Sequence, residues 1–276
     1  MQVKFIFPHW GQKGQPIAEL VAKVKAKGYD GIEINTAATV EETPELVKAL
    51  KDNGMTFVAQ QWLPSQIETA AQYLARFEKN LHYISELRPQ FINSHTGKDY
   101  FSFEDNCKVL DLAADFTHKT GIDIYHETHR GRFPFHTAST APYLEAYPDL
   151  QFTDDFSHWC TVSESMLSDQ PGIMEAVVPR VKYIHARVGF EHSPQVNDPR
   201  APEWQAHVDR FLGWWDAIAA HQFEQGATEL YICPEFGPPP YLPVMPYSRE
   251  PLADQWEIND WVFGVLKGRY KSYTEA

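Results

Sequence analysis

The sequence predicts an α/β fold, a (β/α)8 TIM barrel, because strand-like apolar runs alternate with amphipathic helical segments eight times along the chain. The chain has 276 residues, 43% of them hydrophobic and 14% aromatic, which is enough for a large core. Barrels of this length commonly form one domain. We therefore expect a single barrel domain over residues 1–276.

Eight short runs rich in β-branched and aromatic residues predict the strands. In chain order they cover residues 3–7, 31–34, 56–60, 91–94, 122–127, 150–154, 181–186 and 229–234. Apolar residues spaced three and four positions apart predict the helices between them. In chain order these cover residues 17–27, 44–53, 67–87, 103–120, 140–147, 165–178, 203–222 and 251–266.

Glycine and proline support this assignment. Gly28, Gly54 and Gly121 stand where three helices are expected to end, each shortly before a strand. Pro44 follows Thr43 at an expected helix start. The longest irregular segments, residues 128–139, 188–202 and 236–249, all follow strands of the second half. They are expected on the face where barrel enzymes build their pockets.

Charge and composition limit the partners. The formal net charge is -13, from 24 basic and 37 acidic residues, which disfavours nucleic acid because binding it requires neutralising phosphates. The three cysteines have no CxxC spacing, so neither a disulfide framework nor a zinc–thiolate site is expected. No run approaches the ~18 apolar residues of a membrane span. We expect a cytoplasmic protein with a small carbohydrate ligand, and the aromatic content permits a homo-oligomer.

Four of the expected strands end in side chains that bind metal ions. These are Glu127, one of the pair Asp154 and Asp155, His185 and Glu235. The carboxyl ends of neighbouring barrel strands meet on one face, so these side chains are expected to converge. Burying them together without a cation would cost several kcal/mol for each unpaired charge. The pattern predicts a metal site.

Asp154 and Asp155 compete for one position in this site. Adjacent strand residues point to opposite faces, so only one of the two is expected to face the barrel axis. Asp155 is favoured, because His158 three residues later can approach the same centre. Three carboxylates and one imidazole form a hard, oxygen-rich set. It predicts one divalent ion, Mn2+ first, with Mg2+, Co2+ or Zn2+ as alternatives.

Such a centre suits proton transfer on a sugar. The adjacent hydroxyl and carbonyl groups of a sugar chelate a divalent ion, which polarises the carbonyl and acidifies the neighbouring C–H. A carboxylate on each side can then remove and return the proton, and Glu127 and Glu235 are the candidates. His9, Trp10 and His95 follow or end strands and are expected to contact the substrate.

Five segments together resemble the xylose isomerase-like barrel superfamily, which includes sugar isomerases, ketose 3-epimerases, inosose dehydratase and endonuclease IV. The segments are Gly31-Ile32-Glu33-Ile34, Tyr125-His126-Glu127, Asp155-Phe156-Ser157-His158, Ile184-His185-Ala186-Arg187 and Pro234-Glu235-Phe236-Gly237. The resemblance covers nearly the whole chain. It implies the barrel fold and a metal centre of Glu127, Asp155, His185 and Glu235. It also implies an acid/base pair, Glu127 and Glu235, and a substrate contact by His158.

Two departures from the superfamily pattern matter. The epimerases carry a substrate-binding arginine several residues after the histidine of the seventh strand, whereas Arg187 here follows His185 by two and is the expected substrate-binding residue. The third strand ends in Gln60-Gln61-Trp62 and lacks the histidine that the endonuclease branch needs for a multinuclear zinc site. Together with the acidic charge, this disfavours DNA repair.

Two features of the sequence each allow two interpretations. Glu33 lies inside a strand, where it either reaches the pocket or pairs with a buried base. The loop after Glu127 carries His129, Arg130, Arg132 and His136, which either meet a phosphate or carboxylate or form a solvated basic loop. The solvated loop is the commoner case.

The sequence leads to a divalent-metal-dependent isomerase or epimerase acting on a sugar or keto-sugar. A lyase or dehydratase acting on a keto-sugar or inosose shares the first proton abstraction and is the second hypothesis. The third is a sugar- or partner-binding barrel without catalysis, which would not need an acid/base pair beside a metal.

Overall fold

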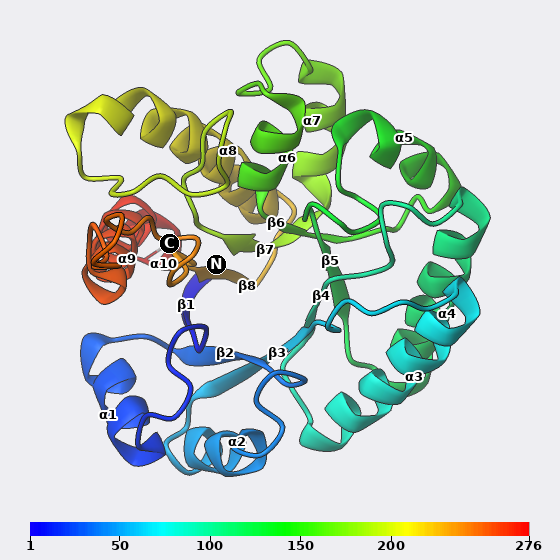
Figure 1. Ribbon diagram of the computed structural model, residues 1–276, viewed down its shortest axis with the longest axis horizontal. Helices are drawn as coiled ribbons and strands as arrows, with labels where there is room; N and C mark the ends of the chain where they lie inside the picture. Colours follow the sequence, from blue (N-terminus) through cyan, green and yellow to red (C-terminus); the bar gives the residue numbers. More distant parts are fainter. Residues whose placement is uncertain (276) are drawn as a thin grey trace.

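The computed structural model is a closed barrel of eight parallel strands with helices around the outside (Figure 1). It describes residues 1–275. The strands are β1 (Gln2–Pro8), β2 (Gly31–Asn35), β3 (Thr56–Gln61), β4 (Ile92–Ser94), β5 (Ile124–Glu127), β6 (Phe152–Asp154), β7 (Val181–His185) and β8 (Glu229–Cys233). Each strand pairs with the next in sequence, and β8 pairs with β1. The prediction of a (β/α)8 barrel is confirmed.

The outer layer consists of ten described helices. They are α1 (Ile17–Lys27), α2 (Thr43–Asp52), α3 (Ala70–Leu87), α4 (Phe103–Thr120), α5 (Thr137–Ala146), α6 (Phe156–Ser163), α7 (Pro171–Val177), α8 (Gln205–Glu224), α9 (Gln255–Arg269) and α10 (Lys271–Glu275). The two chain ends meet beside β1, where the Met1 amino group donates to the Tyr273 carbonyl over 3.0 Å (Figure 1). None of the described helices is long and apolar enough to cross a membrane.

The connection between β6 and β7 differs from the expectation. The sequence predicts one helix over residues 165–178, whereas the structure has α6 directly after β6 and the separate short helix α7. Glu164 adopts a left-handed conformation, with φ 47°, that ends α6, and Pro171 begins α7. The first turn of α6 is buried throughout, from Phe156 to Cys160, so its sequence lacks the polar face that marks an amphipathic helix.

Among the helix starts that differ from the expectation, two are explained by a capping residue. Thr69 and Gln72 form a capping box, so α3 begins at Ala70 rather than at residue 67. The Asp254 side chain accepts from the Glu257 backbone N–H over 2.9 Å and starts α9 at Gln255, rather than at residue 251.

The barrel interior has an apolar lower layer and a polar upper layer. Ile6, Val58, Phe91, Tyr183, Tyr231 and Cys233 form the lower plug, with the ring of Phe91 4.9 Å from Tyr183 and 5.0 Å from Tyr231. Side chains two residues apart share a strand face. The same face therefore carries His185 above Tyr183 and Glu235 above Cys233, and this places polar groups at the carboxyl end of the barrel.

Candidate metal centre and substrate cavity

The four expected ligands come together at the carboxyl ends of their strands. Glu127 ends β5, Asp155 follows β6, His185 ends β7, and Glu235 lies two residues beyond β8. All four are buried, with at most 4% of each residue exposed. Oxygen or nitrogen atoms of Glu127, Asp155 and His185 lie within 4.8 Å of one another, as do those of Glu33, His185 and Glu235. The convergence predicted from the strand ends is therefore present.

His185 is the shared member of both groups. Its Nδ1 lies 3.0 Å from Glu235 Oε2 and 3.7 Å from Glu127 Oε2. His185 Nδ1 and Glu235 Oε2 are both buried, yet neither makes a hydrogen bond of acceptable geometry. A cation bound between His185 Nδ1 and Glu235 Oε2 would give both of these buried atoms a partner. The donor set thus fits a divalent metal ion.

Two further polar residues complete the centre, and sequence reasoning either left them open or missed them. Glu33, inside β2, places Oε2 3.1 Å from His185 Nε2, so it pairs with a buried base. Asn93, in β4, donates from Nδ2 to Glu127 Oε2 over 2.7 Å and lies 3.3 Å from His185 Nε2. Each is a buried polar residue between strand neighbours that face outward. In the sequence, the available signal was a polar residue inside a predicted strand, and its role becomes clear only when the strand register is known.

Arg187 contributes a positive charge on the β6 side of the centre. Its Nη2 donates to Asp155 Oδ2, and its Nη1 lies 3.5 Å from Glu235 Oε2. His158 Nε2 lies 2.9 Å from Arg187 Nη2 and 3.5 Å from Asp155 Oδ2, as the Asp-x-x-His spacing predicts. The Tyr241 ring centre lies 4.9 Å from the guanidinium carbon. Asp154 turns away and accepts from the Phe156 N–H over 2.9 Å, which leaves Asp155 to face the centre.

The protonation of the centre follows from its crowding. Burial lowers the pKa of His185, but Glu235, Glu33 and Glu127 outweigh this effect and raise it well above its ordinary value. Burial raises the pKa of Asp155 to about 7, although Arg187 opposes the rise. Without a cation, the centre therefore holds extra protons near neutral pH, and a bound divalent ion would compete with them.

Three imidazoles form a row from the β4 side of the centre to the β6 side, in the order His95, His129 and His158. His95 Nε2 lies 2.9 Å from Glu127 Oε2. The His129 ring packs between His95 and His158, with ring centres 4.5 and 3.8 Å away. Burial lowers the pKa of His129 well below its ordinary value. The loop after Glu127 is thus at least partly buried rather than a solvated basic loop.

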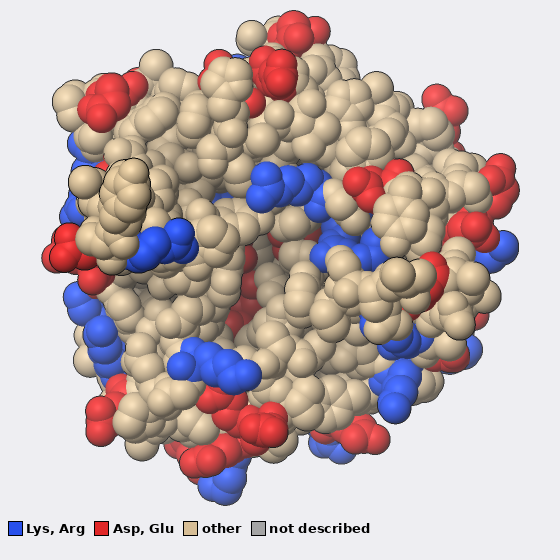
Figure 2. Space-filling view, in the orientation of Figure 1, with Lys and Arg blue, Asp and Glu red and all other residues tan. Residues whose placement is uncertain are grey.

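A cavity of about 420 Å³ opens above the centre. Four of the five expected substrate-binding residues line it, namely His9, Trp10, His95 and Arg187, whereas His158 lies behind Arg187. Trp10, Trp62 and Tyr241 supply aromatic walls, and Trp10 meets Tyr241 edge to face at 4.9 Å. Figure 2 shows this hollow at the middle of the barrel face, with acidic side chains inside and Lys and Arg side chains around it.

The sequence pattern of the xylose isomerase-like TIM barrel family matches residues 21–212. The chain belongs to this family. A search of curated proteins gives no significant match.

Solved structures similar to this member of the family include sugar epimerases and a dehydratase. The 3-keto-D-glucoside 4-epimerase YcjR of E. coli has 16% identity and a TM-score of 0.61, with 97% of this chain and 100% of the other covered. The probable 3-DHS dehydratase AsbF of Bacillus anthracis has 15% identity and a TM-score of 0.60, covering 96% and 99%. A family member from Mycobacterium smegmatis, solved in complex with magnesium, has 14% identity and a TM-score of 0.61, covering 96% and 97%.

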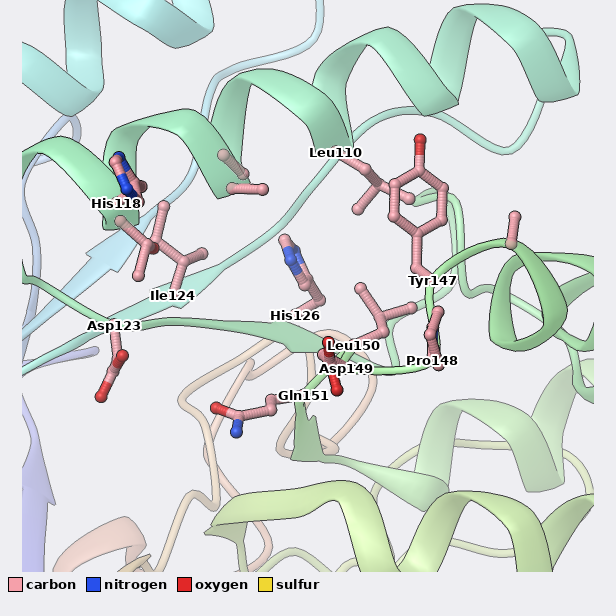
Figure 3. Close-up of a pocket in the computed structure, with 14 residues that line it drawn as sticks. Leu110, His118, Asp123, Ile124, His126, Tyr147, Pro148, Asp149, Leu150 and Gln151 are labelled. Carbon is pink, nitrogen blue, oxygen red and sulfur yellow. The ribbon is translucent and has the colours of Figure 1, made fainter.

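A second cavity, of about 480 Å³, lies on the outer side of β5 between α4 and α5 (Figure 3). His126 reaches it because it points to the opposite face of β5 from Glu127. Its Nδ1 is 2.7 Å from Thr96 Oγ1, and burial lowers its pKa to about 3. This larger cavity has neither the carboxylate cluster nor the aromatic walls of the first. The candidate site of this family member is therefore the cavity above His185.

Proposed function

We propose that this chain is a divalent-metal-dependent isomerase or epimerase that acts on a sugar or keto-sugar by removing a proton next to a carbonyl. One observation carries the proposal. Glu127 and Glu235, from β5 and β8, both approach His185 Nδ1 at the floor of an aromatic-walled cavity. A binding site without catalysis has no need for two carboxylates in this position. The similarity to sugar epimerases supports the same reaction class.

Glu127, Asp155, His185 and Glu235 would hold the metal ion, with Mn2+ as the first choice and Mg2+, Co2+ or Zn2+ as alternatives. When bound, such an ion supplies Lewis-acid polarisation of the substrate carbonyl. The magnesium found with the Mycobacterium smegmatis structure supports a divalent ion in this fold.

Side chains of the cavity and its floor carry out the proton transfer. Glu235 and Glu127 act as the acid/base pair, one removing the proton and the other returning one. Asn93 donates to Glu127 Oε2 and keeps this carboxylate turned toward His185. In an epimerase the proton returns to the other face of the same carbon, whereas in an isomerase it returns to the neighbouring carbon.

Other side chains orient the sugar. The Trp10 ring packs against an apolar sugar face, and the imidazoles of His9 and His95 hydrogen-bond to hydroxyl groups. Arg187 holds a substrate oxygen on the β6 side, and His158, whose Nε2 lies 2.9 Å from Arg187 Nη2, supports it from behind.

A dehydratase reaction is the second candidate, favoured by the similarity to AsbF. It begins with the same proton removal next to a carbonyl. A hydroxyl group on the next carbon then leaves as water, with a proton from the second carboxylate. The two reactions therefore differ in the fate of the substrate rather than in the first step.

Solvent isotope incorporation tests the proposal. The metal-loaded protein is incubated in D2O with a panel of ketoses, 3-keto-glucosides and inososes. A product of sugar composition that carries deuterium on carbon identifies an isomerase or epimerase, and loss of water identifies a dehydratase. Metal binding without exchange or product on any member of the panel would contradict catalysis and favour a sugar-binding barrel.

Glu235→Gln is expected to reduce this exchange by about 10²- to 10⁴-fold, the usual contribution of a general acid or base. Glu229→Gln is the matched control, because Glu229 begins the same strand at its opposite, exposed end. Its exchange rate is expected to equal that of the unmodified protein. Near-normal turnover by Glu235→Gln would overturn the role given to Glu235.

A further inference from the structure

The second cavity, on the outer side of β5, has a mainly apolar wall. Side chains of α4, of β5 and of the segment after α5 form this wall, and the most buried of them are Leu110, Ala113, Ile124 and Leu150, each at most 7% exposed. The volume of about 480 Å³ lies in the range of small-molecule sites. Side chains that border a cavity have no packing partner on that side, so an apolar ligand would gain contacts with them.

Hydrogen bonds fix one end of this cavity. Figure 3 shows Tyr147 at that end and His118 at the other. The Tyr147 hydroxyl donates to Asp111 Oδ1 of α4 over 2.8 Å, and its backbone carbonyl accepts from Arg180 Nη1 over 3.2 Å. These two bonds tie the segment after α5 to α4 and to the residues before β7. The cavity therefore has a preorganised shape, which lowers the cost of ordering its walls around a ligand.

One polar side chain, His126, lies inside the apolar wall. It is 5% exposed, and its ring rises from β5 toward α4 among the apolar side chains that line the cavity (Figure 3). Its Nδ1 is 2.7 Å from Thr96 Oγ1, whereas Nε2, at the distal edge of the ring, makes no hydrogen bond with the described residues. A polar atom in apolar surroundings is stabilised by a hydrogen-bond partner, so Nε2 is the group that a ligand would meet.

A chain of buried hydrogen bonds decides which nitrogen of His126 carries the proton. The Ser94 hydroxyl donates to Gln61 Oε1 over 2.9 Å. Because this uses the single proton of Ser94, Thr96 is the donor in the 2.7 Å contact between the Thr96 and Ser94 hydroxyls. The proton of Thr96 is then used as well, so His126 Nδ1 donates to Thr96 Oγ1. In a neutral imidazole, Nε2 is left with a lone pair, and it accepts a hydrogen bond.

The charges at the rim of the cavity disfavour an anion. Asp123 and Asp149 line it, and no Lys or Arg is among the described residues that do so. Both carboxylates belong to exposed residues, so they remain hydrated at the rim. They would repel a phosphate or carboxylate group that entered between them. The wall, the single acceptor and the rim together favour a neutral ligand that donates one hydrogen bond.

We propose that this outer cavity is a second ligand site, which takes a small neutral molecule that is apolar except for one hydroxyl group, an alcohol or a phenol. The hydroxyl group donates to His126 Nε2, and the apolar part packs against the wall formed by α4 and β5. His126 points to the opposite face of β5 from Glu127, so this site is separate from the metal centre. The inference does not depend on the proposed function.

NMR signals of two lining residues test the site in the full-length protein. Phenol and toluene are the probes, because they differ by a hydroxyl group in place of a methyl group of similar size. The Ile124 methyl signals report occupancy, and the 15N signal of His126 Nε2 reports the hydrogen bond. We expect both probes to shift the Ile124 signals and only phenol to shift the His126 signal.

Three results of this titration would contradict the proposal. No shift of the Ile124 signals, up to the solubility limit of both probes, would overturn the site. A shift of these signals by phenol without a change at His126 Nε2 would overturn the recognition of the hydroxyl group. Benzoate is the anionic probe and is expected to leave Ile124 unshifted, so binding as tight as that of phenol would overturn the neutral class.

Two variants separate the hydrogen bond from the space. His126→Leu is expected to lower the ratio of phenol affinity to toluene affinity by about three- to tenfold, the usual net value of one hydrogen bond. Ala113→Leu fills the cavity from α4 and is expected to abolish binding of both probes while His126 stays in place. Ala71→Leu, an exposed change on α3, is the matched control and should bind both probes normally.

Either variant is sufficient if the other fails to fold. An unchanged affinity ratio in folded His126→Leu would overturn the role of the imidazole. Unchanged binding of both probes in folded Ala113→Leu would overturn the location of the site.

Discussion

At the scale of single residues, the imidazole of His185 is held from both sides. Glu33 Oε2 lies 3.1 Å from Nε2, and Glu235 Oε2 lies 3.0 Å from Nδ1. An ionised carboxylate only accepts hydrogen bonds, so Glu33 places the ring proton on Nε2. When a metal ion displaces the second ring proton, the lone pair of Nδ1 points toward Glu235 and Glu127. Glu33 is therefore a positioning residue that sets the tautomer and the ring angle of a metal ligand.

Replacing Glu33 tests this role through metal affinity. Glu33→Gln is expected to weaken Mn2+ binding by about 10- to 100-fold, as loss of a carboxylate behind a ligating histidine usually does. Titration calorimetry of the metal-free protein measures the change directly. Glu45→Gln, an exposed change on α2, serves as the control and is expected to bind Mn2+ normally. Unchanged affinity in Glu33→Gln would show that His185 needs no such support.

The residues of the centre differ in how well their roles could be predicted from the sequence. Glu127, Asp155, His185 and Glu235 stand at strand ends, where a polar residue interrupts an apolar run, so their convergence could be predicted. Asn93 is not visible in this way, because a polar residue within a strand reveals its role only when strand register is known. For Glu33 the same ambiguity left two interpretations, and the contact with His185 decides between them. Burial of Arg132 depends on loop packing, which periodicity does not describe.

At the scale of elements, the strands were predictable and the short helices were not. All eight strands overlap the expected runs, because buried parallel strands are continuous apolar runs between turn residues. The helix α6 was missed because it follows β6 without a linker and its first turn is buried on every side. Helices are predicted from the periodic spacing of apolar residues on one face, and this segment is too short and too apolar to show such a spacing.

Helix α4 fixes the loop after β4 through one side chain. Asn106 spans the loop after β4 with hydrogen bonds to both polar backbone atoms of Lys98. Asn106→Ala would leave these two buried groups unsatisfied, and we expect a loss of about 2–4 kcal/mol in the free energy of unfolding, measured by urea denaturation. The exposed Asn53→Ala, which removes a hydrogen bond to Ala49 at the end of α2, is expected to cost less than half as much. A similar cost for both changes would mean that the loop is held by other contacts.

At the scale of the whole molecule, the candidate centre connects distant parts of the barrel. Its side chains come from β2, β4, β5 and β7 and from residues that follow β6 and β8, so they span most of the closed ring. The lower half of the barrel is filled by an apolar plug, whereas the upper half carries buried carboxylates with few counterions. Repulsion among these carboxylates opposes folding when no cation is bound. Metal binding should therefore stabilise the whole fold and not only the site.

Thermal unfolding with and without Mn2+ tests this coupling. A ligand that binds only the folded state at about 100 times its Kd adds about 2.7 kcal/mol of stability. For a domain of this size we expect a rise in Tm on the order of 5 °C, with one cooperative transition if residues 1–276 form a single domain. Asp155→Asn removes one ligand and is expected to lose most of the rise, whereas the exposed Asp115→Asn on α4 should keep it. An equal rise in all three proteins would place the stabilising ion elsewhere, because only binding through Asp155 makes the effect depend on that carboxylate.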